Sequence, residues 1–269
     1  MRNTRMDARA AAIVVTALLS SAALTGVAAQ AAPAAKTAPA AKTGNADAQL
    51  IAAAQKGDLA QVHQLLAAGA NVNAKAANGT TALMIAAQYG KRDVVKALLK
   101  AKADVAIKRA DGVTALFWAA QLNHADVVKD LLAAKADPNA KNSDGDTALF
   151  EATQNGNLAL AQALIHAKAD VNAQMYNGYT PLMTAATGGQ SPILKLLIAS
   201  HANINARAKD GSSALMLASY SGYYDVIADL IEAGADINAK RPDGQTALKL
   251  AIAGGHNEPI KLLKQKGAK

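Results

Sequence analysis

The hexapeptide Asn78-Gly79-Thr80-Thr81-Ala82-Leu83 is the first of six closely related segments in this chain of 269 residues. The other five begin at Asp111, Asp144, Asn177, Asp210 and Asp243, and each keeps a glycine in second place and a leucine in sixth. The glycines stand at positions 79, 112, 145, 178, 211 and 244, so every interval is 33 residues. A constant period of this length predicts a repeat protein in which each unit packs on its neighbours.

Each segment has the features of a tight turn that leads into a helix. An Asn-Gly or Asp-Gly pair favours a turn, because glycine tolerates positive φ and the Asn or Asp side chain closes the turn. Thr81 and its counterparts are expected to be N-caps, since a hydroxyl can accept hydrogen bonds from amides that the first helical turn leaves unpaired. Pro181 directly follows Thr180, where the first helical residue is expected.

Every unit is expected to contain two short helices. In the first helix Leu83, Ala86 and Ala87 fall on one face, and Gly90 ends the helix. A second helix is expected over about residues 92–100, followed by an extended segment that returns to the next turn. The residues expected to point inward from this second helix are Val94, Val95, Leu98 and Leu99.

Turn, helix, break, helix and extended return are the parts of an ankyrin repeat, and the sequence resembles that family along residues 45–269. The family's Thr-Pro-Leu-His becomes Thr-Ala-Leu-Met or Thr-Ala-Leu-Phe here, and only Thr180-Pro181 keeps the proline. The resemblance implies an all-α repeat solenoid of paired antiparallel helices and hairpin-like turns, with a degenerate N-terminal cap and a truncated C-terminal cap. The seven expected units are residues 45–77, 78–110, 111–143, 144–176, 177–209, 210–242 and 243–269.

The end of the second helix is expected to adopt a left-handed conformation in every unit. Glycine holds this position at Gly69, Gly234 and Gly267, as helix ends commonly require. The central units instead carry Lys102, Lys135, Lys168 and His201 there. A residue with a side chain in this conformation costs about 1 kcal/mol or more, so these units are expected to be strained at that point.

The N-terminus has the order of a secretory signal peptide. Three arginines in the first nine residues precede an uncharged stretch over residues 10–24, and small residues follow. We expect residues 1–29 to be the signal peptide, with cleavage after Ala29 or Ala31. An uncleaved anchor is the alternative, but fifteen helical residues span only ~22 Å of the ~30 Å hydrocarbon core. Residues 30–44, rich in Ala, Pro and Lys, are expected to be a disordered linker.

No group of residues predicts a catalytic centre. The chain has no cysteine, and its five histidines lack the spacing of metal ligands; only His124 and His256 share a place in their repeats. The aspartates that recur before each glycine are expected to be turn residues. We therefore expect a protein that is not an enzyme and binds no metal and no cofactor.

The chain has a net charge of +8, and basic residues recur at one position of the turn tips. One interpretation is a solvated rim, and the other is an electropositive ladder that steers an acidic partner. The ladder residues are Lys75, Lys108, Lys141, Arg207 and Lys240, and Arg109 and Arg241 reinforce two of the tips.

Aromatic residues form the second group of candidate binding residues. Tyr89, Trp118 and Tyr220 are expected on the outward side of first helices, and Tyr176 and Tyr179 bracket one tip. Trp and Tyr combine apolar area with a polar group, so they serve well as interface anchors. Packing between adjacent repeats is the alternative role for them.

These observations predict a non-catalytic protein–protein interaction module, scaffold or accessory factor in the bacterial periplasm, or a secreted one. We expect a monomer that binds a protein partner. The basic ladder would favour an acidic partner. No membrane span is expected after signal cleavage, and export separates the chain from intracellular nucleic acid. The alternative function is binding of an anionic envelope polymer through the basic ladder.

Overall fold

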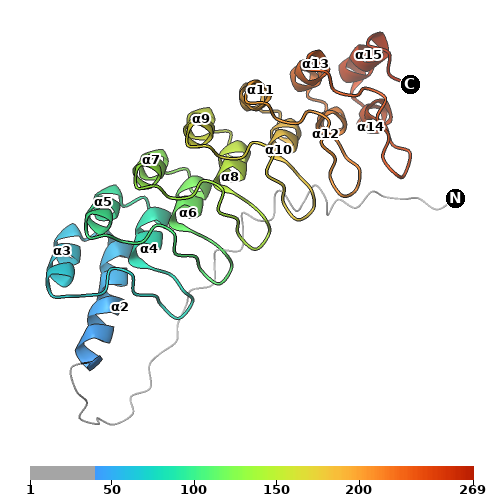
Figure 1. The fold of residues 1–269 in the computed structure, drawn as a ribbon. Helices are drawn as coiled ribbons and strands as arrows, with labels where there is room; N and C mark the ends of the chain where they lie inside the picture. The colour runs from blue at the N-terminus through green and yellow to red at the C-terminus, as the bar shows by residue number, and fades with distance from the viewer. Residues whose placement is uncertain (1–39) are drawn as a thin grey trace. The chain divides into compact units, whose positions relative to one another are not determined.

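The computed structural model describes residues 40–269, so the expected signal peptide and most of the expected linker lie outside the described residues. Two rows of helices run along this part of the chain, and hairpin-like loops project from one of them (Figure 1). The first helices of the units are α2 (Ala40–Lys56), α4 (Ala82–Gln88), α6 (Ala115–Gln121), α8 (Ala148–Gln154), α10 (Pro181–Thr187), α12 (Ala214–Ser221) and α14 (Ala247–Ala253). The second helices are α3 (Leu59–Ala67), α5 (Arg92–Lys100), α7 (Ala125–Ala133), α9 (Leu158–His166), α11 (Ser191–Ala199), α13 (Tyr224–Glu232) and α15 (Asn257–Gln265).

The helices contact one another as a stack of repeats requires. Each first helix packs on its own second helix, and successive first helices from α2 to α14 pack on one another. The helix α2 begins at Ala40, within the segment expected to be linker. In residues 40–269, no helix is long and apolar enough to cross a membrane.

The N-caps form at five of the six turns. The hydroxyls of Thr81, Thr114, Thr180, Ser213 and Thr246 accept hydrogen bonds of 3.2 to 3.3 Å from the backbone N–H three residues later. The expectation is wrong for Thr147, whose Oγ1 is buried and has no hydrogen-bond partner within residues 40–269. Its backbone carbonyl accepts the N–H of Phe150 at 3.1 Å instead, because the first turn of α8 is tighter there.

The core lies between the two rows of helices and follows the expected pattern. Leu83, Ala86 and Ala87 are at most 1% exposed, as is the valine pair Val94 and Val95 of the second helix. Leu99, which was also expected to point inward, packs against this core but is only half-buried. Alanine at the closest contacts lets neighbouring first helices approach each other, which suits a core with few aromatic residues.

The four non-glycine residues at the ends of the second helices have the expected left-handed conformation. The backbone φ is 66° for Lys102, Lys135 and His201, and 71° for Lys168. Gly69, Gly234 and Gly267 adopt 87°, 90° and 92° at the same place. The central units therefore carry strain that the units with glycine avoid.

Lys135→Gly is therefore expected to stabilise the protein by about 0.5 to 1 kcal/mol, because glycine removes the steric cost of positive φ. The gain is smaller than the full strain, since glycine also has more freedom in the unfolded chain. The midpoint of thermal unfolding should rise by roughly 2 °C. Ala133→Gly, inside α7, is the matched control and should lower it; an equal drop for both variants would contradict the strain argument.

Asparagine side chains link successive units through the loops that follow the second helices. The Asn73 Oδ1 atom accepts the backbone N–H of Asp104 at 2.8 Å, and Asn139 accepts that of Asp170 at 2.7 Å. The Asn139 amide also donates to the Lys168 carbonyl oxygen at 3.0 Å. Asn172, Asn205 and Asn238 repeat the first of these bonds, and each donates to the next helix end as well.

One link of this series is missing because residue 106, which occupies the same position, is alanine. Ala106 is exposed, so there is room for a longer side chain. In Ala106→Asn the new side chain should accept a hydrogen bond from the N–H of Asp137 and donate one to the carbonyl of Lys135. The free energy of unfolding, measured by denaturant titration, should rise by about 1 kcal/mol. Ala106→Asp can accept but cannot donate and should give a smaller gain. No gain from either variant would contradict the prediction.

Candidate functional site

Backbone hydrogen bonds join the four middle hairpin tips into one edge. The N–H of Ser143 donates to the Asp111 carbonyl at 2.7 Å, and that of Tyr176 donates to Asp144 at 3.0 Å. The Lys209 N–H continues the series with a bond of 2.9 Å to the Asn177 carbonyl. The four tips that begin at Asp111, Asp144, Asn177 and Asp210 are thus fixed relative to one another, which suits them to present side chains to a partner.

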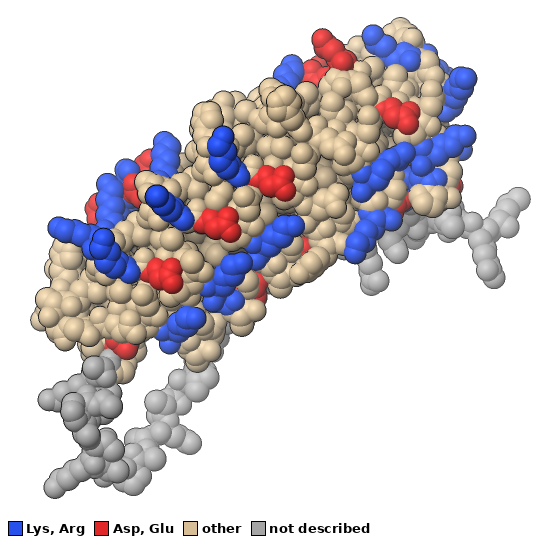
Figure 2. All heavy atoms as spheres, viewed as in Figure 1, with Lys and Arg blue, Asp and Glu red and all other residues tan. Residues whose placement is uncertain are grey.

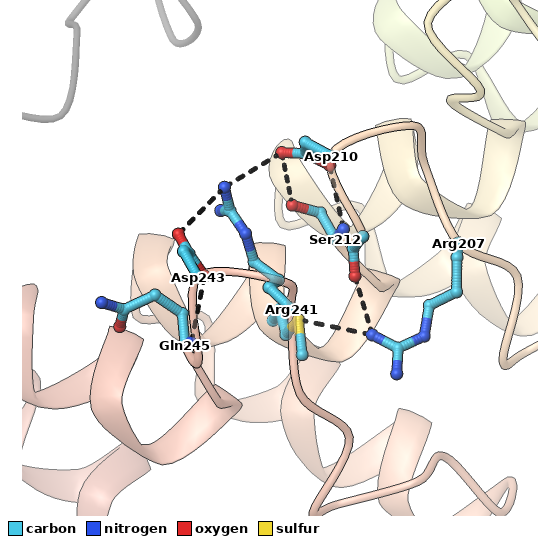
Figure 3. Close-up of polar contacts among 8 residues, drawn as sticks. Arg207, Asp210, Ser212, Arg241, Asp243 and Gln245 are labelled. Atoms are coloured by element: carbon cyan, nitrogen blue, oxygen red, sulfur yellow. Dashed lines mark hydrogen bonds and ion pairs between the residues drawn. The ribbon is translucent and has the colours of Figure 1, made fainter.

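The last tip is joined by an ion pair in place of the backbone bond. Pro242 has no N–H to donate at this position. The Arg241 guanidinium lies between two carboxylates, 3.4 Å from Asp210 and 3.5 Å from Asp243 (Figure 3). Asp210 also accepts a bond of 2.8 Å from the Ser212 hydroxyl. Arg241 therefore holds two tips together, and its charge is balanced.

The basic ladder has members of two kinds. Lys75, Lys108 and Lys240 are exposed, and within residues 40–269 their side chains have no hydrogen bond or ion pair. Lys141 donates to the Gln174 carbonyl at 3.1 Å, and Arg207 donates to the Gly211 carbonyl at 2.7 Å. Figure 2 shows basic side chains in two groups along the edge where Figure 1 draws the loops. All five ladder residues thus keep a charge that no carboxylate in residues 40–269 pairs, and the side chains of the three lysines are also free of hydrogen bonds there.

Arg109 does not add a free charge to its tip. Its guanidinium pairs with the Asp111 carboxylate and lies 5.0 Å from the centroid of the Trp118 ring. A guanidinium over an indole is a favourable cation–π contact. Arg109 therefore fixes the tip against α6, as Arg241 fixes two tips to each other.

The surface of the first helices lies next to the tips, as the Arg109–Trp118 contact shows. The fourth residues of the six first helices from α4 to α14 lie on the same side as Trp118; these residues are Ile85, Trp118, Glu151, Thr184, Leu217 and Leu250. We call this set the fourth-position column, and the column together with the hairpin tips the inner face. Its aliphatic members and Thr184 are buried or half-buried, so the column is largely desolvated.

The expectation that Trp118 points outward is wrong. Its side chain is only 9% exposed and belongs to the core. The helix α6 packs between α4 and α8, so a large ring at the fourth position is covered by its neighbours and by Arg109. Trp118 thus contributes an edge to the inner face and not a protruding anchor.

The expected tyrosines lie in two separate places. Tyr176 is 67% exposed at a tip, while Tyr179 is half-buried against the core, and burial followed by the Asp210 charge raises the pKa of its hydroxyl. Tyr89 and Tyr220 are 47% and 44% exposed near the C-terminal ends of α4 and α12. The structure therefore does not bring these aromatic residues into one patch.

Two of the histidines have structural roles. The Nε2 atom of His124 lies 3.0 Å from the Gln88 carbonyl oxygen, and that of His256 lies 2.9 Å from the Tyr220 carbonyl oxygen. The His124 ring thus links the start of α7 to the end of α4, and the His256 ring links the start of α15 to the end of α12. In both cases the first helix belongs to the preceding unit. Hydrogen bonding across units explains why both occupy the same place in the repeat.

Sequence reasoning missed the most unusual member of the fourth-position column. Glu151 is 9% exposed, and burial, reinforced by the charge of Asp146, raises the pKa of its carboxyl group to about 7. Burial also raises the pKa of Asp146, against a hydrogen bond from Asn142 that lowers it. Aligning the six first helices in register would have revealed the acid, since Ile, Leu and Leu stand at the same place in three other units.

The comparisons with known proteins agree with this architecture. The model of the family described as ankyrin repeats (3 copies) matches residues 50–142, 106–175, 123–208, 149–241 and 207–269. The crystal structure of the human ASB11 ankyrin repeat domain is similar, with a TM-score of 0.72 and 26% sequence identity. The match covers 82% of this chain and 98% of the human one. No protein with a curated description matches the chain. From its repeats and its fold, the chain belongs to the ankyrin-repeat family.

Proposed function

We propose that this chain is a non-catalytic binding module of the bacterial periplasm that holds a protein partner on its inner face. Ankyrin repeats generally mediate protein–protein interaction. The observation that carries the proposal is the row of tips beside a largely desolvated column. Backbone bonds and the Arg241 ion pairs fix the five tips from Asp111 to Asp243. Three lysines without intramolecular partners in residues 40–269 stand along that row and would steer a partner with acidic groups.

The test is a comparison of two lysine-to-glutamine triple variants of the full chain. Lys75→Gln/Lys108→Gln/Lys240→Gln changes the tips, and Lys96→Gln/Lys100→Gln/Lys264→Gln removes equal charge from the exposed surface of second helices. Proteins captured from periplasmic extract by the unchanged chain should be lost with the tip variant only. Equal capture by both variants would count against the inner face as the binding surface.

The periplasmic location rests on the N-terminal sequence and has its own test. Expression of the full chain in a Gram-negative bacterium, followed by fractionation, should place the protein in the periplasm. N-terminal sequencing of that fraction should give a chain that begins at Gln30 or Ala32, after cleavage at Ala29 or Ala31. A full-length chain in the cytoplasm would contradict the location.

The unpaired lysines also favour a second candidate function, the binding of an anionic envelope polymer. Such binding releases counterions, so the logarithm of the affinity should fall linearly with the logarithm of the salt concentration. Dextran sulfate is a suitable probe, because it offers charge without a protein fold. A steep slope that the tip triple variant reduces would favour the polymer, whereas a weak salt dependence would favour a protein.

A further inference from the structure

Glu151 is a charged residue in a position built for an apolar one. It occupies the fourth place of α8, where α4, α12 and α14 have Ile85, Leu217 and Leu250. Its side chain is about nine-tenths buried, and nothing in residues 40–269 gives it a hydrogen bond or an ion pair. A buried carboxylate without a partner destabilises a fold, so this residue calls for an explanation.

The carboxylate of Glu151 is not sealed inside the core. Both of its oxygens lack a hydrogen-bond partner in residues 40–269, yet neither is a fully buried atom, so both keep some exposure to solvent. The charge that acts on it is that of Asp146, which has the same sign. Arg109, at the tip one unit earlier, is engaged by Asp111 and Trp118. The site therefore offers a carboxyl group whose ionised form is left unbalanced by the described residues.

We propose that Glu151 receives one lysine or arginine side chain of the protein that binds the inner face. This inference rests on the proposed function, because it names a feature of the partner of that same surface. A cationic side chain would give Glu151 a charge-assisted hydrogen bond in a place shielded from water, where such bonds are strong. Its aliphatic stem would lie along the fourth-position column, which is mostly apolar.

The positive charges of the tips and the negative charge of Glu151 together would define the position of the partner along the stack of repeats. Lys75, Lys108 and Lys240 favour acidic groups along the tips, while Glu151 and Asp146 favour one basic group near the middle of the stack. A partner shifted by one unit would place its basic residue opposite Thr184 or Trp118 and leave Glu151 unpaired. The single acid would thus fix the register, as a lone polar residue does in other interfaces.

The experiment selects peptides from a random phage-displayed library on the immobilised full chain and on its Glu151→Gln variant. Glu232→Gln, on the exposed surface of α13, is the matched control for the same chemical change. Peptides selected on the unchanged chain and on the control should share a lysine or arginine at one aligned position. Selection on Glu151→Gln should lose that preference.

A double-mutant cycle then tests the contact directly. With a selected peptide, Glu151→Gln should weaken binding on the order of tenfold or more, and replacing the peptide's basic residue by glutamine should weaken it similarly. The two changes together should cost much less than their product, because each removes the same contact.

The outcomes separate this inference from the proposed function. Peptides without a shared basic residue, or the same basic preference on Glu151→Gln, would overturn the inference and leave the inner face as a binding surface. No enrichment on any form of the chain would count against both. Independent effects in the cycle would show that the basic residue binds elsewhere, and would also overturn the inference.

Discussion

Glu151→Leu is expected to raise the free energy of unfolding at pH 7.5 by about 2 to 3 kcal/mol, an unusually large gain for one substitution. The pKa of the Glu151 carboxyl is raised from 4.5 to about 7 in the folded chain. Between these values the unfolded chain has released this proton and the folded chain still holds it. The unfolded state then binds fewer protons, so stability falls as the pH rises from 4.5 to about 7.

The measurement is denaturant unfolding between pH 5 and pH 8. The unchanged chain should lose stability over this range relative to Glu151→Leu and Glu151→Gln, neither of which carries the titrating group. Glu232→Gln should follow the unchanged chain, because that carboxylate is exposed. Parallel stability profiles for all four proteins would show that Glu151 is charged in the folded state without penalty.

A cost to stability of this size, once measured, would support a functional origin for Glu151. Replacing an acid by leucine at this position requires no new backbone, since Leu217 and Leu250 already occupy it in other units. Proteins commonly retain destabilising residues where binding or catalysis needs them. If Glu151→Leu is more stable and also loses the preference for basic residues in peptide selection, then the same residue lowers stability and serves binding.

The regular part of the fold could be predicted because each rule acts within one unit. The 33-residue period, the threonine caps and the left-handed helix ends depend on local backbone chemistry, and the structure confirms them with Thr147 as the exception. Burial at the fourth position depends instead on what the adjacent units place beside it. For that reason Trp118 was expected at the surface and Glu151 was overlooked.

The charge of the hairpin tips also depends on contacts that the sequence does not show. The sequence has seven basic residues at these positions, but whether a charge is free depends on distances across the turn. Arg109 and Arg241 have aspartates within reach, at Asp111 and at Asp210 and Asp243. Lys75, Lys108 and Lys240 have no such partner within residues 40–269, so they remain the candidates for contact with another molecule.

The second large effect is expected at Gly178, whose conformation and surroundings both exclude a side chain. Its φ is +83°, and a Cβ atom there would lie 2.9 Å from the backbone nitrogen of Lys209 and 3.1 Å from the Cα of Ala208. The Lys209 N–H is the donor that links this tip to the next through the Asn177 carbonyl. Gly178→Ala must therefore strain its own backbone and also displace the neighbouring tip.

Two other glycines separate these contributions. Gly244 has a φ of +77°, and a Cβ atom there would meet no other atom within 4 Å; Gly79 has a φ of +82° with only ordinary contacts beyond 3.4 Å. Alanine at either should cost about 1 kcal/mol, from the left-handed backbone alone. Gly178→Ala should cost about 3 kcal/mol, because the clash and the loss of the hydrogen bond between tips add to that strain. Hydrogen exchange should also become faster at the Lys209 amide in this variant only. Equal losses at all three glycines would show that the tips are not coupled, and the inner face would then lack the rigid edge on which its binding role depends.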